Sequence, residues 1–188
     1  MIQNHWFQGS MGSAVAFLMV AAYAGFPAAS ANPTSCTFQF DAVAETAHGT
    51  ISSGENLKGQ IKFTLNRSDE EGQSRDYPAK GENIVTRPGG GGLSGKIRFV
   101  RVTRSPAVGD SLLIDARDVS GNLGQVKNYF DPMLFAVYGK PGMLSNFDLP
   151  RGSDGWNAFN MKRVFQYNSP VSDNPVLHQI GPLKGGCT

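Results

Sequence analysis

The chain is poor in charge. Lys, Arg, Asp and Glu together make up only 17% of its 188 residues, whereas about 25% is usual for a globular protein. So few charges exclude a charge-rich disordered chain and a long coiled coil. The 17 basic and 15 acidic side chains leave a net charge of +2, too small for a dedicated nucleic-acid binder. We therefore expect a folded chain with room for one ordinary domain and no nucleic-acid partner.

The chain also lacks the linear motifs of common enzymes and metal sites. Beyond residue 31 the only histidines are His48 and His178, and they do not have metal-ligand spacing. The G-x-S-x-G nucleophile elbow is absent, although a catalytic triad or a carboxylate pair could still assemble from scattered residues. Gly90–Lys96 matches G-x-x-x-x-G-K, but Ile97 follows where a phosphate loop needs Ser or Thr. We predict no cofactor and no metal site.

Charge is entirely missing from residues 1–31. Within them Ala14–Ala24 is an uninterrupted apolar run, too short for a membrane span of about 20 residues but typical of the core of a secretory signal. Ala29–Ala31 has the small-residue A-x-A pattern of a cleavage site. We predict a signal peptide over residues 1–31 and a mature domain over 32–188.

The basic residues expected before such a signal core are missing, because Met1–Ser13 contains no Lys or Arg. An uncleaved N-terminal anchor or a buried N-terminal helix is therefore the alternative. The true start, Met1 or Met11, stays open.

Only two cysteines are present, Cys36 and Cys187, near the two ends of the predicted mature domain. In an oxidising compartment this placement predicts one disulfide that joins those ends. Unpaired thiols or an intermolecular link are the alternative. Neither cysteine has the C-x-x-C spacing of a redox site.

Residues 32–188 contain little helical periodicity and many turn residues, which favours an all-β fold. The runs with strand-like patterns are Cys36–Val43, Leu57–Leu65, Lys96–Arg104, Leu112–Ala116, Met133–Tyr138 and Val164–Tyr167. Asn66–Pro78 has the composition of a polar loop, and one short helix is expected near 154–162. We predict an antiparallel β-sandwich that resembles a jelly roll in architecture.

Two of these segments are similar to each other. Leu57–Phe63 and Leu93–Phe99 share the pattern L-x-G-x-I-x-F, which indicates two equivalent strands of one domain. Two copies are too few for a solenoid. Coincidence between two amphipathic strands explains the pattern equally well.

These similar strands carry the basic residues that we single out as candidate ligand contacts. The residues are Lys58, Lys62, Lys96, Arg98 and Arg104. If the two strands are neighbours, their polar faces form a cationic patch for an anionic glycan, a lipid headgroup or an acidic protein surface. The alternative is a solvated face whose charges are offset by acids on adjacent strands.

Trp156 is the last candidate contact, because it lies in a polar, Gly-rich segment. A tryptophan on a loop can stack on a sugar ring or anchor an interface. Equally, it can fill the end of the core.

Together these observations predict an exported, secreted or periplasmic protein that binds an extracellular or envelope component without catalysis. One alternative is a secreted hydrolase with a dispersed site that includes His48 or His178. The other is a structural or assembly subunit whose strand edges pair with a partner. No membrane span is expected after signal removal, and the sequence leaves the ligand, the strand order and the oligomeric state open.

Overall fold

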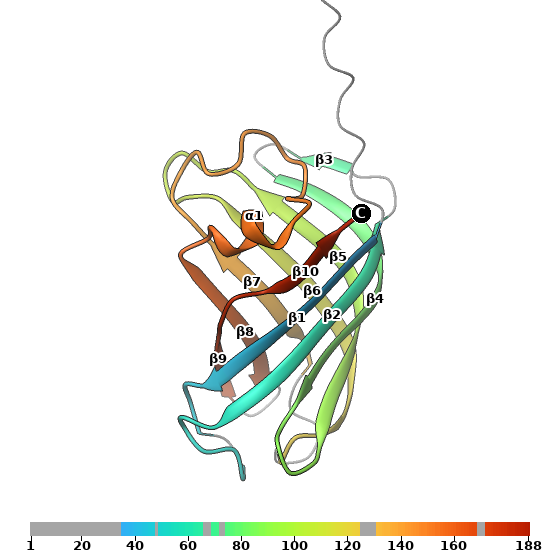
Figure 1. Ribbon diagram of the computed structural model, residues 1–188, viewed down its shortest axis with the longest axis vertical. Helices are drawn as coiled ribbons and strands as arrows, with labels where there is room; N and C mark the ends of the chain where they lie inside the picture. The colour runs from blue at the N-terminus through green and yellow to red at the C-terminus, as the bar shows by residue number, and fades with distance from the viewer. Residues whose placement is uncertain (1–34, 48, 66–68, 72–73, 125–130, 169–171) are drawn as a thin grey trace, which may run out of the picture. The chain divides into compact units, whose positions relative to one another are not determined.

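A computed structural model describes residues 35–188 except for 48, 66–68, 72–73, 125–130 and 169–171 (Figure 1). The predicted signal peptide and His48 lie outside the described residues. The domain contains, in chain order, β1 (Ser35–Ala44), β2 (Asn56–Leu65), β3 (Asp69–Glu71), β4 (Ser74–Thr86), β5 (Gly92–Thr103), β6 (Ser111–Asn122), β7 (Met133–Tyr138), α1 (Ser153–Asn157), β8 (Met161–Asn168), β9 (Ser172–Ile180) and β10 (Lys184–Cys187).

The strands form one antiparallel sheet in the order β10-β1-β2-β4-β5-β6-β7-β8-β9, and β3 pairs with β4. Because β9 also pairs with β1, the sheet closes into a barrel of 8 strands. The predicted sandwich is therefore wrong, although the fold is all-β and antiparallel. A sandwich needs two sheets that pack face to face, whereas here the pairing continues around the whole circumference and leaves a single interior.

The barrel interior is filled by side chains that alternate along each strand. On β1 the even-numbered residues Phe38, Phe40 and Ala42 are buried, and the residues between them are exposed. The ring of Phe40 lies 5.6 Å, centroid to centroid, from the ring of Phe135 on β7. An eight-stranded barrel is just wide enough for such side chains to pack across it.

β5 contains a bulge that its sequence pattern does not indicate. The sequence places Ile97 and Phe99 on one face and Val100 and Val102 on the other. In the structure Ile97, Val100 and Val102 are all buried, because the register with β6 shifts between Ile97 and Phe99. An extra residue in a strand reverses the parity of every residue after it, so Val100 and Val102 face the same interior as Ile97, and Phe99 is only partly buried.

One end of the barrel is covered by residues 139–160, which we call the cap and which contain α1 (Figure 1). The cap buries Leu144, Leu149, Trp156 and Phe159 against the barrel. Asp110, which directly precedes β6, fastens the cap to the barrel. Its carboxylate accepts hydrogen bonds from the backbone N–H groups of Ser105 and Leu144. The predicted helix is present but shorter than expected.

The barrel is closed along β1 by two consecutive segments of the chain. Residues 178–180 of β9 pair with Ala42–Ala44, and β10 pairs with residues 36–39 at the other end of β1. Between them the N–H of Gly181 donates to the carbonyl of Asp41 at 2.9 Å. β9 and β10 therefore act as two halves of one closing strand.

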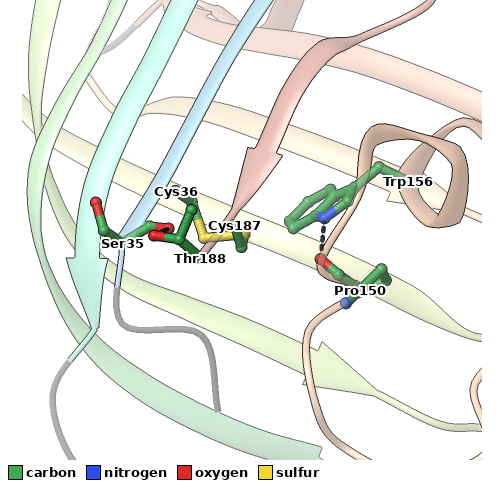
Figure 2. Close-up of a disulfide and its surroundings, with 6 residues drawn as sticks. All are labelled: Ser35, Cys36, Pro150, Trp156, Cys187 and Thr188. Carbon is green, nitrogen blue, oxygen red and sulfur yellow. Dashed lines mark hydrogen bonds between the residues drawn. A yellow bond between two sulfur atoms is a disulfide. The ribbon is translucent and has the colours of Figure 1, made fainter.

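A disulfide joins Cys36 to Cys187, which confirms the predicted pairing (Figure 2). The two residues lie directly opposite each other in the β1–β10 ladder, and both are buried. The bond thus covalently links β1 to the second half of the closing strand.

Removing this disulfide should destabilise the fold strongly. The cysteines are 151 residues apart, and closing a loop of that length in the unfolded chain is worth about 5 kcal/mol in the chain-entropy model. The variant with Cys36→Ala and Cys187→Ala together should lose several kcal/mol in urea unfolding at equilibrium. Reduction of the wild-type protein should reproduce that loss, and an unchanged midpoint would show that β1 and β10 hold together without the bond.

Asn83 is the one fully buried asparagine among the described residues, and its side chain points into the barrel from β4. Within the described part of the chain, neither its amide nitrogen nor its amide oxygen has a hydrogen-bond partner. Its neighbours in register are Ile61 and Gly95, which offer no side-chain polar group. A buried polar group without a partner costs about 1–3 kcal/mol.

Asn83→Leu keeps the number and branching of the side-chain heavy atoms and removes both unpartnered polar groups, so it should raise the free energy of unfolding by about 1–3 kcal/mol. Chemical denaturation of both proteins measures this difference. The exposed Asn56→Leu is the control and should change stability by less than about 0.5 kcal/mol. A clear loss of stability in Asn83→Leu would show that the amide is hydrogen-bonded to internal water.

Candidate functional site

The structure separates the two basic strands that the sequence suggested as neighbours. β4 lies between β2 and β5 in the sheet. Glu82 of β4 is paired in register with Lys62 on one side and with Lys96 on the other. The five basic candidates therefore do not form one continuous patch.

On β5, Lys96 and Arg98 share one acidic partner. Both lie close to one carboxylate oxygen of Asp118, Arg98 Nη2 at 2.6 Å and Lys96 Nζ at 3.8 Å. These pairs are solvent-exposed, so they add little stability, and the carboxylate offsets half of the local positive charge. This part of the wall corresponds to the alternative of a solvated face with offset charges.

Arg104 lies just beyond the end of β5, against the cap. Its guanidinium carbon is 5.5 Å from the centroid of the Phe147 ring, and that of Arg75 is 5.4 Å from the same ring. Tyr77 donates from its hydroxyl to the carbonyl oxygen of Phe147 at 2.7 Å. Arg104 is thus part of the seam that holds the cap, at a distance from the basic residues of β2.

Trp156 is fully buried at the end of the barrel. Its indole N–H donates to the carbonyl oxygen of Pro150 at 2.7 Å (Figure 2). Its ring centroid is 4.8 Å from that of Phe38. The side chain occupies the core position that the sequence left as the alternative to an exposed contact.

The outer wall of the barrel carries two adjoining clefts over β1, β2 and β4. The first cleft has a volume of about 480 Å³ and is lined by residues that include Gln39, Asp41, Lys58, Gln60 and Lys184. The second has a volume of about 270 Å³, and its lining includes Lys62, Lys80 and Glu82. The two clefts share Gln60 and Ile84, so we treat them as one candidate site.

Gly59 explains how the wall is built beneath the first cleft, which it lines together with Phe40. A Cβ atom at residue 59 would lie 1.9 Å from Cζ of Phe40. Only glycine lets the phenyl ring pack directly on the backbone of β2 at this point. A side chain at this position would displace the ring and deform the cleft.

Four lysines give the site its charge, namely Lys58, Lys62, Lys80 and Lys184. All four are exposed, and among the described residues none of them forms an ion pair. The carboxylates of Asp41 and Glu82 also line the clefts, so positive charge prevails. The site can therefore hold an anionic group that reaches several ammonium groups at once.

The sequence identified only half of these lysines. Lys58 and Lys62 were recognised because β2 has a clear strand pattern. Lys80 was missed because β4 begins in a segment predicted to be a loop, and Lys184 was missed because the Gly-rich β10 has no apolar alternation. The run of β-branched residues Ile84–Thr86 is the sequence signal that could have indicated β4.

His178, the described histidine of the alternative hydrolase, is fully buried and lines neither of these clefts. Burial lowers its pKa from 6.5 to about 4, and the nearby charge of Glu55 opposes the shift only in part. The imidazole is therefore neutral near pH 7. No group of three or more His, Cys, Asp or Glu side chains that could hold a metal ion occurs in the described part of the chain.

The low pKa of His178 predicts a loss of stability in acid. Because the unfolded state takes up a proton near pH 6.5 and the folded state only near pH 4, stability falls as the pH drops through this window. The full contribution of this residue is about 3 kcal/mol. His178→Gln should show a correspondingly flatter stability profile between pH 7 and pH 4, measured by urea unfolding.

Nuclear magnetic resonance of the folded protein provides the control, since the His178 ring should titrate near pH 4. A ring that titrates at its ordinary value would contradict both the burial and the expected pH dependence.

No protein-family model, curated protein or solved structure matches the chain. None of the described helices is long and apolar enough to cross a membrane. The geometry of the site is therefore the basis for a functional proposal.

Proposed function

We propose that this chain is an exported binding protein that recognises an anionic component outside the cytoplasm through the lysine-lined clefts on its outer wall. The observation that carries the proposal is the contrast between two sets of basic residues. Lys96 and Arg98 of β5 share an ion pair with Asp118, whereas the four lysines of the clefts have no ion pair among the described residues. Unpaired cations that converge on a cleft favour binding of an anion.

The packed interior of the barrel favours a ligand site on the outer wall over one inside the barrel. The interior is occupied by packed aromatic and aliphatic residues, and the clefts open on the outer wall. The clefts contain lysine, glutamine and carboxylate side chains without a histidine. Such a lining suits recognition by charge and hydrogen bonds, and it favours a binding protein over the alternative hydrolase.

Export is supported by two independent features. A structural disulfide is typical of oxidising compartments, so Cys36–Cys187 points to a location outside the cytoplasm. Residues 1–31 have the apolar run and the A-x-A pattern of a secretory signal. A secreted or periplasmic location follows from the two together.

The proposal predicts that the protein binds a polyanion and that this binding depends on the cleft lysines. Dextran sulfate should bind and neutral dextran should not, and added salt should weaken the complex because the charges are exposed. Replacing two exposed ion-pair donors costs up to about 1 kcal/mol each, so Lys58→Gln with Lys62→Gln should weaken binding about tenfold. Isothermal titration calorimetry measures both effects.

Lys140→Gln is the matched control for the single variants Lys58→Gln and Lys62→Gln, because Lys140 is also exposed and follows β7 away from both clefts. It removes the same type of charge from the same protein. Equal losses of affinity for the control and the single cleft variants would mean that dextran sulfate responds only to net charge, and the proposed site would be abandoned.

A further inference from the structure

A third cleft lies on the other side of the closing strand. Its volume is about 200 Å³, and its lining includes Asn157, Asn160, Lys162, Arg163 and Gln179. Gly181 and Pro182, at the junction of β9 and β10, form its border. This cleft is mainly polar, like the first, whereas the lining of the second also includes Phe63 and Ile84.

The third cleft adjoins the first cleft across the segment Ile180–Lys184. Ile180 lines the third cleft, whereas Lys184 lines the first. The N–H of Gly181 bonds to the carbonyl of Asp41, which also lines the first cleft. The three clefts therefore follow one another along the outer wall, from β4 over β2 and β1 to the closing strand and β8.

This row of clefts extends both along the strands and around the barrel wall. Thr64, which is paired with Lys80, is six residues from Lys58 along β2, or about 20 Å at the usual rise per residue. Around the wall, β4, β2, β1, β9 and β8 are successive neighbours, and four inter-strand spacings amount to about 19 Å. A compact anion would occupy only one cleft, whereas a chain-like ligand can contact all three.

The residues that line the clefts also indicate which kind of chain-like ligand fits. Amide side chains recur along the row, with Gln39, Gln60, Asn160 and Gln179 beside the basic groups. Amides both donate and accept hydrogen bonds, which suits a ligand that presents hydroxyl groups between its negative charges. None of the exposed large hydrophobic residues of the described chain, Val43, Val108, Tyr138 and Met161, lines these clefts, so the apolar anchors of a membrane surface are missing here.

We propose that the occupant is a linear acidic polysaccharide that runs across all three clefts, with its carboxylate or sulfate groups on the lysines and its hydroxyl groups on the amides. This inference rests on the proposed function and specifies its ligand class. It assigns Asn160, Gln179 and Arg163 to the same binding site as Lys58 and Lys62. The charge of Arg163 is offset by an ion pair with Glu45 at 2.8 Å, so in the third cleft this residue offers N–H donors to hydroxyl groups and Lys162 is the cation of the lining.

The test is a chain-length series on the intact protein with polygalacturonate, its short oligomers and galacturonate itself. Affinity per chain should rise with length until the ligand spans the row and then level off. Gln179→Glu and, separately, Asn160→Asp place a negative charge in the third cleft. Each should weaken binding of the long polymer about threefold to tenfold while leaving the shortest oligomers that bind at the lysines unaffected.

Ser120→Asp is the matched control for these variants, since it adds the same charge on the exposed part of β6 outside the clefts. Thermal unfolding of each variant checks that the barrel is intact. Affinity that does not depend on chain length, or that ignores both third-cleft variants, would overturn the inference. Binding of dextran sulfate without binding of polygalacturonate would also overturn it. In each of these cases the proposed function is tested separately, by whether binding of dextran sulfate still depends on Lys58 and Lys62.

Discussion

The pairing of β1 with the closing strand is the interaction on which the rest of the structure depends. Because β1 bonds to β2 on one side and to β9 and β10 on the other, the sheet has no open edge along this strand. Closure creates the interior that Phe38, Phe40 and Phe135 fill. It also creates the outer wall on which β4, β2, β1 and the closing strand become neighbours, and with them the lysines of the clefts.

The cap and the closing strand support each other. The side chain of Asn157 in α1 bonds to both the N–H and the carbonyl of Leu183, at 2.7 and 3.0 Å. Gly152 forms a bridge with Gly186, next to the disulfide. The cap thus covers the edge of β10 that pairs with no strand. Asn157 lines the third cleft, and its hydrogen bonds to Leu183 also hold the closing strand in place.

Local pattern was sufficient for several strands but not for the fold. β1, β2 and β7 were predicted nearly to their ends, because their buried and exposed residues follow simple patterns. β4 was missed in part because Pro78, Lys80, Gly81 and Glu82 have weak strand propensity. The choice between sandwich and barrel depends on whether β1 meets β9, and no local pattern reports a pairing between segments so far apart. The site was only half predicted because Lys80 joins Lys58 and Lys62 through the pairing of β4 with β2, and Lys184 joins them through the pairing of β10 with β1, and the sequence patterns of β4 and β10 indicated neither strand.

The topology also sets an order of events during synthesis. β1 is among the first strands to emerge, yet the partners that cover its second edge are residues 178–187, more than a hundred residues later. Contacts of such high sequence separation slow folding and cannot form while the chain is incomplete. Until then the β1 edge has unpaired backbone groups, and an exposed edge strand invites pairing with other chains. The folding of a chain with this architecture should therefore depend on a holdase-type chaperone, or on rapid completion of synthesis. A barrel that is closed by neighbouring hairpins should depend on them less.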